Sequence, residues 1–219
     1  DMYGMFWDCH SLKTIPRLNT VQVISMNRMF KDCFELNAVP KLNTSNVTDM
    51  SYMFAGCAKI KEIPQLNTEN AQGMSCMFSG CSSLTLVPKL DTHSIKDASY
   101  MFADCSKLTT IPFFETDFCE DMNSMFMNCS SLTFIPSFST YNVKTMSHMF
   151  YKCSKLKTIP QFGTVRCIDM SYMFGHNVEL TSVPLLDTSN VEHMNGMFID
   201  CRKLSAVPHF NTKNVTNMS

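Results

Sequence analysis

The apolar residues of this chain follow a pattern that changes rhythm over a short distance. Met50, Met53, Phe54 and Cys57 lie at positions i, i+3, i+4 and i+7. This spacing is typical of one face of a helix. We therefore expect a short helix or 3-10 turn in this segment, with Asp49 capping its start.

A second apolar segment follows directly. Ile60 and Ile63 frame two polar residues and precede Pro64, which indicates a short strand closed by proline. We expect Leu66 to point inward after it, and Thr68 to belong to a polar corner. Each unit is thus predicted to run from strand to corner to a second extended piece, and then into the short helix.

The whole pattern returns every 24 residues, without insertion or deletion. A Met-Phe pair marks the start of each of nine units, at Met5, Met29, Met53, Met77, Met101, Met125, Met149, Met173 and Met197. We call the set of positions related by this period a column, and name it after its member of lowest number. All nine prolines, from Pro16 to Pro208, share one column.

A fixed period of this length is typical of leucine-rich repeats, in which one unit cannot enclose its apolar face without a neighbour. We predict a single domain over residues 1–219. Its expected fold class is an α/β repeat solenoid, a leucine-rich-repeat-like right-handed coil of nine stacked units. We expect the stack to be curved and to be truncated within a unit at both ends.

Eight of the eleven cysteines share one column, in which Asn177 occupies the remaining position. Disulfides, a row of metal ligands and buried thiols are the three interpretations. A chain with this much core does not need disulfides, and no clustered ligands support a metal. We favour small buried thiols that face the backbone, with the amide of Asn177 taking the same place. Cys119 and Cys167 replace valine on the inward extended piece and are expected in the core as well.

Two further columns have alternative explanations. The methionine columns could indicate soft-metal binding, but they lie at core spacing, so packing is favoured. The threonine column, from Thr20 to Thr212, could be an ice-binding ladder. We favour hydroxyl groups that bond to the backbone at the corner.

Composition and charge argue against several classes of function. The net charge of −1 gives no electrostatic basis for binding nucleic acid, and no apolar run is long enough for a membrane-spanning segment. The six histidines occupy six different positions of the repeat. No catalytic or phosphate-binding motif is present. We expect neither an enzyme nor a cofactor or metal site.

The unit "MFxxCxxLxxIPxLxTxxVxxMS", seen in "MSYMFAGCAKIKEIPQLNT" from Met50 to Thr68, resembles the repeat of the BspA-type leucine-rich-repeat surface proteins. The resemblance covers the whole chain and includes the related repeat of bacterial surface lipoproteins. It implies a bacterial protein at the cell surface or secreted, with a protein or glycan ligand on another cell or on matrix. It also implies flanking repeats or domains in the full-length protein, and it brings no catalytic residues.

A binding site would lie on the columns that vary, which begin at Thr14, Arg17, Val21 and Gln22. Relaxed solvent exposure is the ordinary explanation for such variation. However, large apolar residues gather on these columns in units four to seven: Leu86, Phe113, Phe118, Phe134, Tyr141 and Val165. We call these six residues the apolar patch and predict that it anchors a ligand, because exposed apolar patches usually mark partner sites.

Two other classes of function remain open. A structural spacer or self-assembling stalk, including a phage or virion receptor-binding component, would need no apolar patch and would have a uniformly polar exterior. An enzyme would need a pocket of convergent polar groups. Adhesion or host and matrix recognition by a non-enzymatic binding module is the function that the sequence favours.

Overall fold

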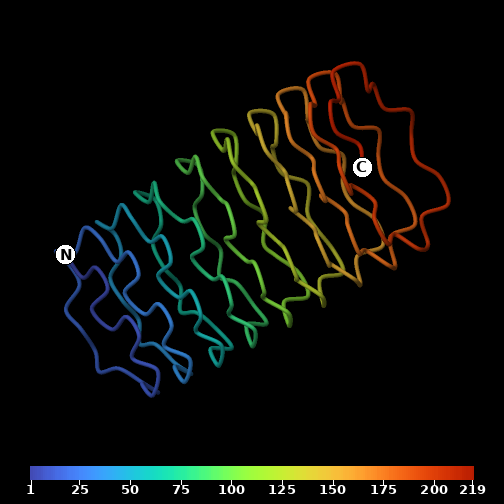
Figure 1. The fold of residues 1–219 in the computed structure, drawn as a ribbon. Coiled ribbons are helices and arrows are strands. Elements are labelled where there is room, and N and C mark those ends of the chain that lie inside the picture. The colour runs from blue at the N-terminus through green and yellow to red at the C-terminus, as the bar shows by residue number, and fades with distance from the viewer.

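The computed structural model describes all 219 residues. The chain winds into a single row of stacked coils, with the N-terminus at one end of the row and the C-terminus at the other (Figure 1). It contains no α-helix and no continuous β-strand, only consecutive turns, irregular extended segments and isolated parallel bridges. No part of it is a helix with the length and apolarity that a membrane span requires.

The segment predicted as a helix is a run of overlapping turns. The N–H of Met53 donates to the carbonyl of Met50 at 3.1 Å, and the N–H of Cys57 donates to that of Phe54 at 3.0 Å. Each bond closes a four-residue turn rather than a helical ring of the i→i−4 kind. Tyr52 has a φ of 60°, which an α-helix excludes. No helix forms here, and the predicted short helix or 3-10 turn is not confirmed.

The remaining amides of this segment explain why the turns replace the helix. The N–H of Met50 donates to Gly73 at 2.8 Å, and the N–H of Phe54 donates to Met77 at 2.9 Å, both in the next coil. Amides therefore alternate between closing a turn and joining two coils. The apolar residues at helical spacing still point inward, and the side chains of Met50 and Phe54 are fully buried.

The segment predicted as a strand is extended but forms almost no ladder. Ile60 and Ile63 are buried as expected, yet in this segment only Glu62 and Leu86 form a bridge. The other parallel bridges lie on the Asp1 column, between its members from Ser25 to Asn217, after the second extended piece. Asp49, in that column, accepts the N–H of Ser51 at 2.9 Å. It therefore caps the run of turns instead of a helix.

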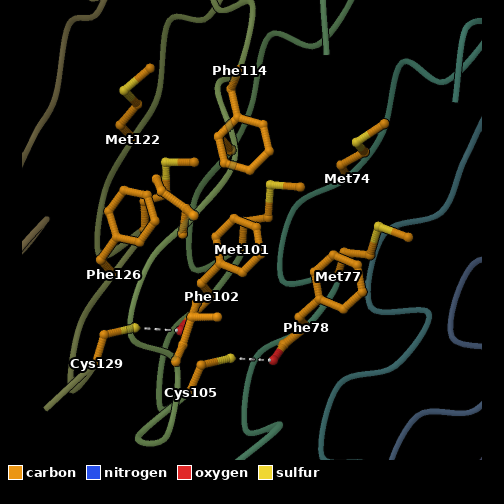
Figure 2. Close-up of a cluster of buried hydrophobic side chains, with 14 of the residues drawn as sticks. Met74, Met77, Phe78, Met101, Phe102, Cys105, Phe114, Met122, Phe126 and Cys129 are labelled. Carbon is orange, nitrogen blue, oxygen red and sulfur yellow. Dashed lines mark hydrogen bonds between the residues drawn. The ribbon is translucent and has the colours of Figure 1, made fainter. Parts of the chain in front are cut away.

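Identical side chains stack on one another through the core. The rings of Phe78 and Phe102 lie 5.5 Å apart, and those of Phe102 and Phe126 lie 5.7 Å apart with an interplanar angle of 2°. Figure 2 shows this row with methionine side chains along one side of it. The stack runs without a break from Phe6 to Phe198. The predicted solenoid of units stacked in register is confirmed.

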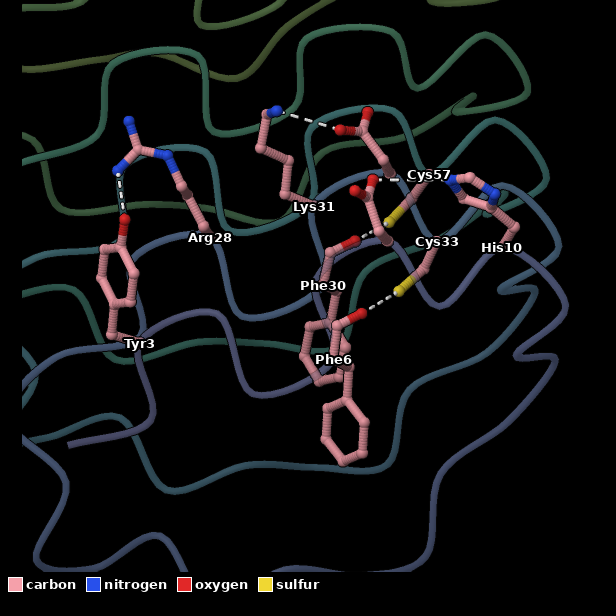
Figure 3. A network of polar contacts seen from close by, with 10 residues as sticks. Tyr3, Phe6, His10, Arg28, Phe30, Lys31, Cys33 and Cys57 are labelled. Atoms are coloured by element: carbon pink, nitrogen blue, oxygen red, sulfur yellow. Dashed lines mark hydrogen bonds and ion pairs between the residues drawn. The ribbon is translucent and has the colours of Figure 1, made fainter.

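The cysteine column forms a second row beside the rings. The Sγ of Cys105 donates to the carbonyl of Phe78 at 3.2 Å, and that of Cys129 donates to Phe102 at 3.1 Å (Figure 2). Cys33 and Cys57 make the same contacts at the N-terminal end (Figure 3). All eleven cysteines are free thiols. The prediction of thiols that face the backbone is confirmed from Cys33 to Cys201. Cys9, in the first coil, is exposed.

Asn177 takes the place of a thiol, as expected. Its Nδ2 donates to the carbonyl of Phe150 at 3.0 Å, the bond that a cysteine makes elsewhere. Its Oδ1, however, is buried without any hydrogen-bond donor. An orphaned buried acceptor costs about 1–3 kcal/mol. Asn177 therefore lowers the stability of the cysteine column at this position.

The threonine column is buried at the corner from Thr20 to Thr188 and bonds to the next coil. The hydroxyl of Thr20 donates to the carbonyl of Asn43 at 2.8 Å and accepts the N–H of the same residue at 2.8 Å. Thr44 makes the same pair of bonds to Asn67. With their hydroxyls used in this way, these threonines are not a surface ladder, and the prediction of hydroxyl-to-backbone bonding is confirmed.

Replacing Asn177 by cysteine should stabilise the protein. In Asn177→Cys the thiol keeps a donor for the carbonyl of Phe150, and the orphaned acceptor disappears. We expect the free energy of unfolding to rise by about 1–3 kcal/mol in urea denaturation. The reverse change in the same column, Cys105→Asn, is the matched control and should destabilise. An unchanged or lower stability of Asn177→Cys would contradict this account of the row.

The buried thiols should make the fold sensitive to alkali. Burial raises the pKa of Cys33 to about 11 and the pKa values of Cys119 and Cys167 to about 12. An unfolded thiol ionises near pH 8.5, so above this pH the unfolded state holds fewer protons than the folded state. The contribution of the buried thiols to stability is therefore fully present below pH 8.5. Above this pH the free energy of unfolding falls by about 1.4 kcal/mol per thiol for each further pH unit.

Circular dichroism under reducing conditions should show cooperative unfolding as the pH rises above about 9. The double variant Cys105→Ser, Cys129→Ser keeps a donor at both positions and removes two titrating groups. Its stability should fall less steeply with pH than that of the wild type. Equal slopes for the two proteins would show that thiol ionisation does not drive the transition.

Candidate functional site

The columns predicted to carry a binding site lie on the segment that runs from two residues before the proline to the second extended piece. In unit five, Ile111, Phe114 and Cys119 point into the core and are buried, while Phe113 and Phe118 between them are exposed. Adjacent residues of this segment, such as Phe113 and Phe114 or Phe118 and Cys119, lie on opposite faces. The outward columns of this segment form one continuous face of the solenoid.

Five of the six residues of the apolar patch are largely exposed. Their exposed fractions are 59% for Leu86, 55% for Phe113, 63% for Phe118, 61% for Phe134 and 55% for Tyr141. Val165 is half-buried. The phenylalanines of the inward columns are, in contrast, buried from Phe30 to Phe174. Other large apolar residues, such as Tyr3 and Ile24, are also exposed. The patch is distinguished by its place on the outward columns of four successive units.

Three members of the patch lie close together. Phe118, Tyr141 and Val165 occupy neighbouring columns on three successive coils. The backbone of Tyr141 lies against Gly163 of the next coil, whose missing Cβ would be 3.7 Å from the Cα of Tyr141. Arg166 places its guanidinium 5.3 Å from the ring centre of Tyr141, a cation–π contact that covers one side of the ring.

The other three members extend the patch across the face. Leu86 and Phe134 share the Thr14 column and lie two coils apart, with Thr110 between them. Phe134 precedes Tyr141 by seven residues, a span of at most about 25 Å in an extended chain. Phe113 lies between these two columns. The six residues thus form a band over units four to seven rather than one compact cluster.

Leu185 belongs to the same band but is absent from the predicted set. It lies in the Arg17 column, as Phe113 does, and its exposed fraction is 61%. The signal was present in the sequence, because the Arg17 column contains only two large apolar residues, Phe113 and Leu185. It extends the apolar band into unit eight.

A groove lies on the same face in units one to four and was not predicted. It encloses about 920 Å³ and is lined by the Arg17, Leu18, Asn19, Thr20 and Val21 columns. Its exposed side chains are mainly polar, among them Lys41, Asn43 and Lys89. The face therefore has a polar half and an apolar half.

One acid in the groove is already engaged. Asp91 accepts a hydrogen bond from His93, and this bond lowers the pKa of the Asp91 carboxyl and raises the pKa of the His93 ring. Because the histidine pKa is raised, the pair keeps its opposite charges to a higher pH than free histidine would. Glu69 is the other carboxylate of the groove.

The sequence matches one family model along its whole length. The family is described as "Mycoplasma protein of unknown function, DUF285", and it matches residues 1–111, 85–183 and 120–219. The chain belongs to the DUF285 family. The overlapping matches follow from the repeat, since any run of units in this DUF285 protein resembles the next. No curated protein sequence matches the chain significantly.

Three solved structures of bacterial leucine-rich-repeat proteins resemble this DUF285 chain in fold. A leucine rich cell surface protein from Faecalibacterium prausnitzii has a TM-score of 0.58 and 19% identity, over 95% of this chain and 62% of that one. A leucine-rich repeat protein from Eubacterium ventriosum has a TM-score of 0.55 and 18% identity, over 94% and 56%. The T. pallidum leucine rich repeat protein has a TM-score of 0.52 and 18% identity, over 87% and 76%.

These similarities confirm the leucine-rich-repeat fold of the DUF285 chain, which spans 62% of the length of the F. prausnitzii protein. The predicted resemblance thus holds at the level of bacterial leucine-rich-repeat proteins. At this level of identity the comparison shows the fold alone, so the function depends on the chain's own exposed residues.

Proposed function

We propose that this chain is a non-enzymatic protein-recognition module of a bacterial surface or secreted protein of the BspA type, with a role in adhesion or in host or matrix recognition. The observation that carries the proposal is the apolar patch. Phe113, Phe134 and Tyr141 each expose more than half of their surface, although the rings of the inward columns are buried from Phe30 to Phe174. Aromatic side chains dominate the energetics of protein interfaces.

The core beneath the patch contains larger side chains than the core of most other units. Phe114, Phe138 and Phe162 fill an inward column that holds leucine in units one to four and in unit eight. The ring of Phe114 stacks on Phe102 at 5.7 Å. Units five to seven therefore combine larger buried rings with larger exposed ones. A rigid backing reduces the entropy that a surface loses when it binds a partner.

A spacer or self-assembling stalk is the alternative function. Such a protein requires no exposed aromatic side chains, and these reduce solubility. The three solved structures with this fold support a repeat module, and one of them is described as a cell surface protein. The exposed aromatic residues favour recognition over a passive spacer.

The proposed function can be tested with a random dodecapeptide display library selected on the wild-type chain. Peptides enriched in this way should bind at least about tenfold more weakly to the variant Phe113→Ser, Phe134→Ser, Tyr141→Ser, because loss of interface anchors costs about 2 kcal/mol or more. Fluorescence anisotropy with the labelled peptides measures the affinity.

The matched control replaces three exposed aromatic residues of the turn segment: Tyr3→Ser, Phe34→Ser, Tyr100→Ser. It should bind the peptides as the wild type does. Both variants should keep the wild-type denaturation midpoint, since surface changes are usually worth less than about 0.5 kcal/mol. Failure to enrich any peptide, or equal binding by the patch variant, would count against a recognition function at this face.

A further inference from the structure

The polar groove and the apolar band are two parts of one continuous face. In the Arg17 column, Lys89 of unit four is followed one coil later by Phe113 of unit five. The Val21 column likewise passes from the groove into Tyr141 and Val165. Neighbouring coils lie close together, with the rings of the Leu18 column 5.4 Å apart where Phe138 meets Phe162. One elongated partner can therefore contact both halves.

The groove half is rich in positive charge that has no partner within the chain. Arg17, Lys41 and Lys89 all line the groove and are exposed. None of them takes part in any of the ion pairs that the structure contains. Other lysines on the solenoid are paired, such as Lys59, which lies 2.8 Å from Glu35. The unpaired cations of the groove are thus available to carboxylates of a partner.

A row of oriented amides lies beside these cations. The Oδ1 atoms of Asn43 and Asn67 accept the N–H groups of Ser45 at 3.1 Å and Glu69 at 3.0 Å, and Asn19 makes the same contact at 3.3 Å. These bonds hold each side chain in place and leave its Nδ2 group without an acceptor. The groove therefore offers oriented hydrogen-bond donors, one on each coil of units one to three.

The carboxylates of the groove do not balance its positive charge and its amide donors. Asp91 is hydrogen-bonded to His93, and Glu69 is the only other carboxylate among the lining residues. A partner that fits the groove therefore needs to supply acceptors and negative charge. A partner that fits the adjoining band needs to supply apolar side chains.

We propose that this face binds an extended polypeptide segment, whose acidic half lies over the groove of units one to four and whose apolar half lies over units five to eight. The proposal rests on the proposed recognition function and specifies the chemistry of its partner. A polypeptide provides carboxylates for the cations, main-chain carbonyls for the asparagine amides and apolar side chains for the band. A uniformly anionic glycan would match only the groove.

The dimensions of the face suit such a segment. Neighbouring coils in a parallel arrangement lie about 4.8 Å apart, so the seven steps from unit one to unit eight cover about 34 Å. An extended chain advances about 3.3 Å per residue, so about ten residues span this distance. A dodecapeptide is therefore long enough to reach both halves.

Selection of the random dodecapeptide display library on two proteins tests the proposal. Peptides enriched on the wild-type chain should carry aspartate or glutamate in one half and leucine or aromatic residues in the other. The acidic excess should disappear when the library is selected on Arg17→Ser, Lys41→Ser, Lys89→Ser. The control Lys107→Ser, Lys155→Ser, Lys157→Ser removes three other exposed, unpaired lysines and should leave the acidic excess intact.

Affinities of the enriched peptides complete the test. Wild-type binding should weaken about tenfold between low and physiological salt, and the groove variant should lose most of this dependence. Enriched peptides that are apolar but not acidic, or an acidic excess that persists on the groove variant, would overturn the proposal and leave the recognition function standing. A heparin column that retains the chain through Arg17, Lys41 and Lys89, with no acidic peptide enriched, would overturn it in favour of a glycan. Failure to enrich any peptide would overturn both.

Discussion

The hydrogen bonds between successive coils are the constraint on which the rest of this structure depends. In each coil, alternate amides of the turn segment donate to the carbonyls of the next coil, as Phe30 does to Met53 and Phe54 does to Met77, both at 2.9 Å. The donor and acceptor are always 23 residues apart in this segment. Insertion of a single residue would exchange the amides that close turns with the amides that join coils. The constant period of 24 residues follows from this requirement.

The side chains of the cysteine column add a second set of hydrogen bonds between successive coils. The carbonyl of Phe54 accepts the N–H of Cys57 at 3.0 Å from its own coil and the Sγ–H of Cys81 at 3.2 Å from the next coil. Both lone pairs of the carbonyl are thus used in a region closed to water. A buried carbonyl without these donors would cost free energy. The thiol is small enough to fit there, and only a side chain with a donor can replace it, as Asn177 does.

The inward columns could be predicted from the sequence because burial depends on spacing rather than on the type of element. Met50 and Phe54 were assigned to the core as helical residues, and they are buried although no helix forms. Consecutive turns place side chains inward at the same intervals as a short helix. What distinguishes the two is the positive φ at positions such as Tyr52 and His148. Neither residue is a glycine, but Gly4 and Gly196 adopt the same positive φ in the same column, so the sequence contains only a weak signal for this conformation.

The candidate site also has one part that could be predicted from the sequence and one part that could not. The exposure of Phe113, Phe118 and Tyr141 could be predicted, because each departs from the polar character of a column already assigned to the surface. The groove could not, since its shape depends on how four coils are placed relative to one another. Once it is known, the columns of Arg17 and Asn19 explain its chemistry. The sequence thus contained the groups of the groove, and the structure was needed to show that they face the same space.

The difference between inward and outward columns explains which positions of this protein can vary. An inward position must match the residues above and below it, so a change such as Asn177 leaves an orphaned acceptor even when the replacement is polar. An outward position has no such neighbour requirement, which is why the Arg17 column passes from cations to Phe113 and Leu185 without disturbing the coil. Different surfaces can therefore be displayed on one unchanged core. A face that is cationic at one end and apolar at the other arises from substitutions in only a few columns.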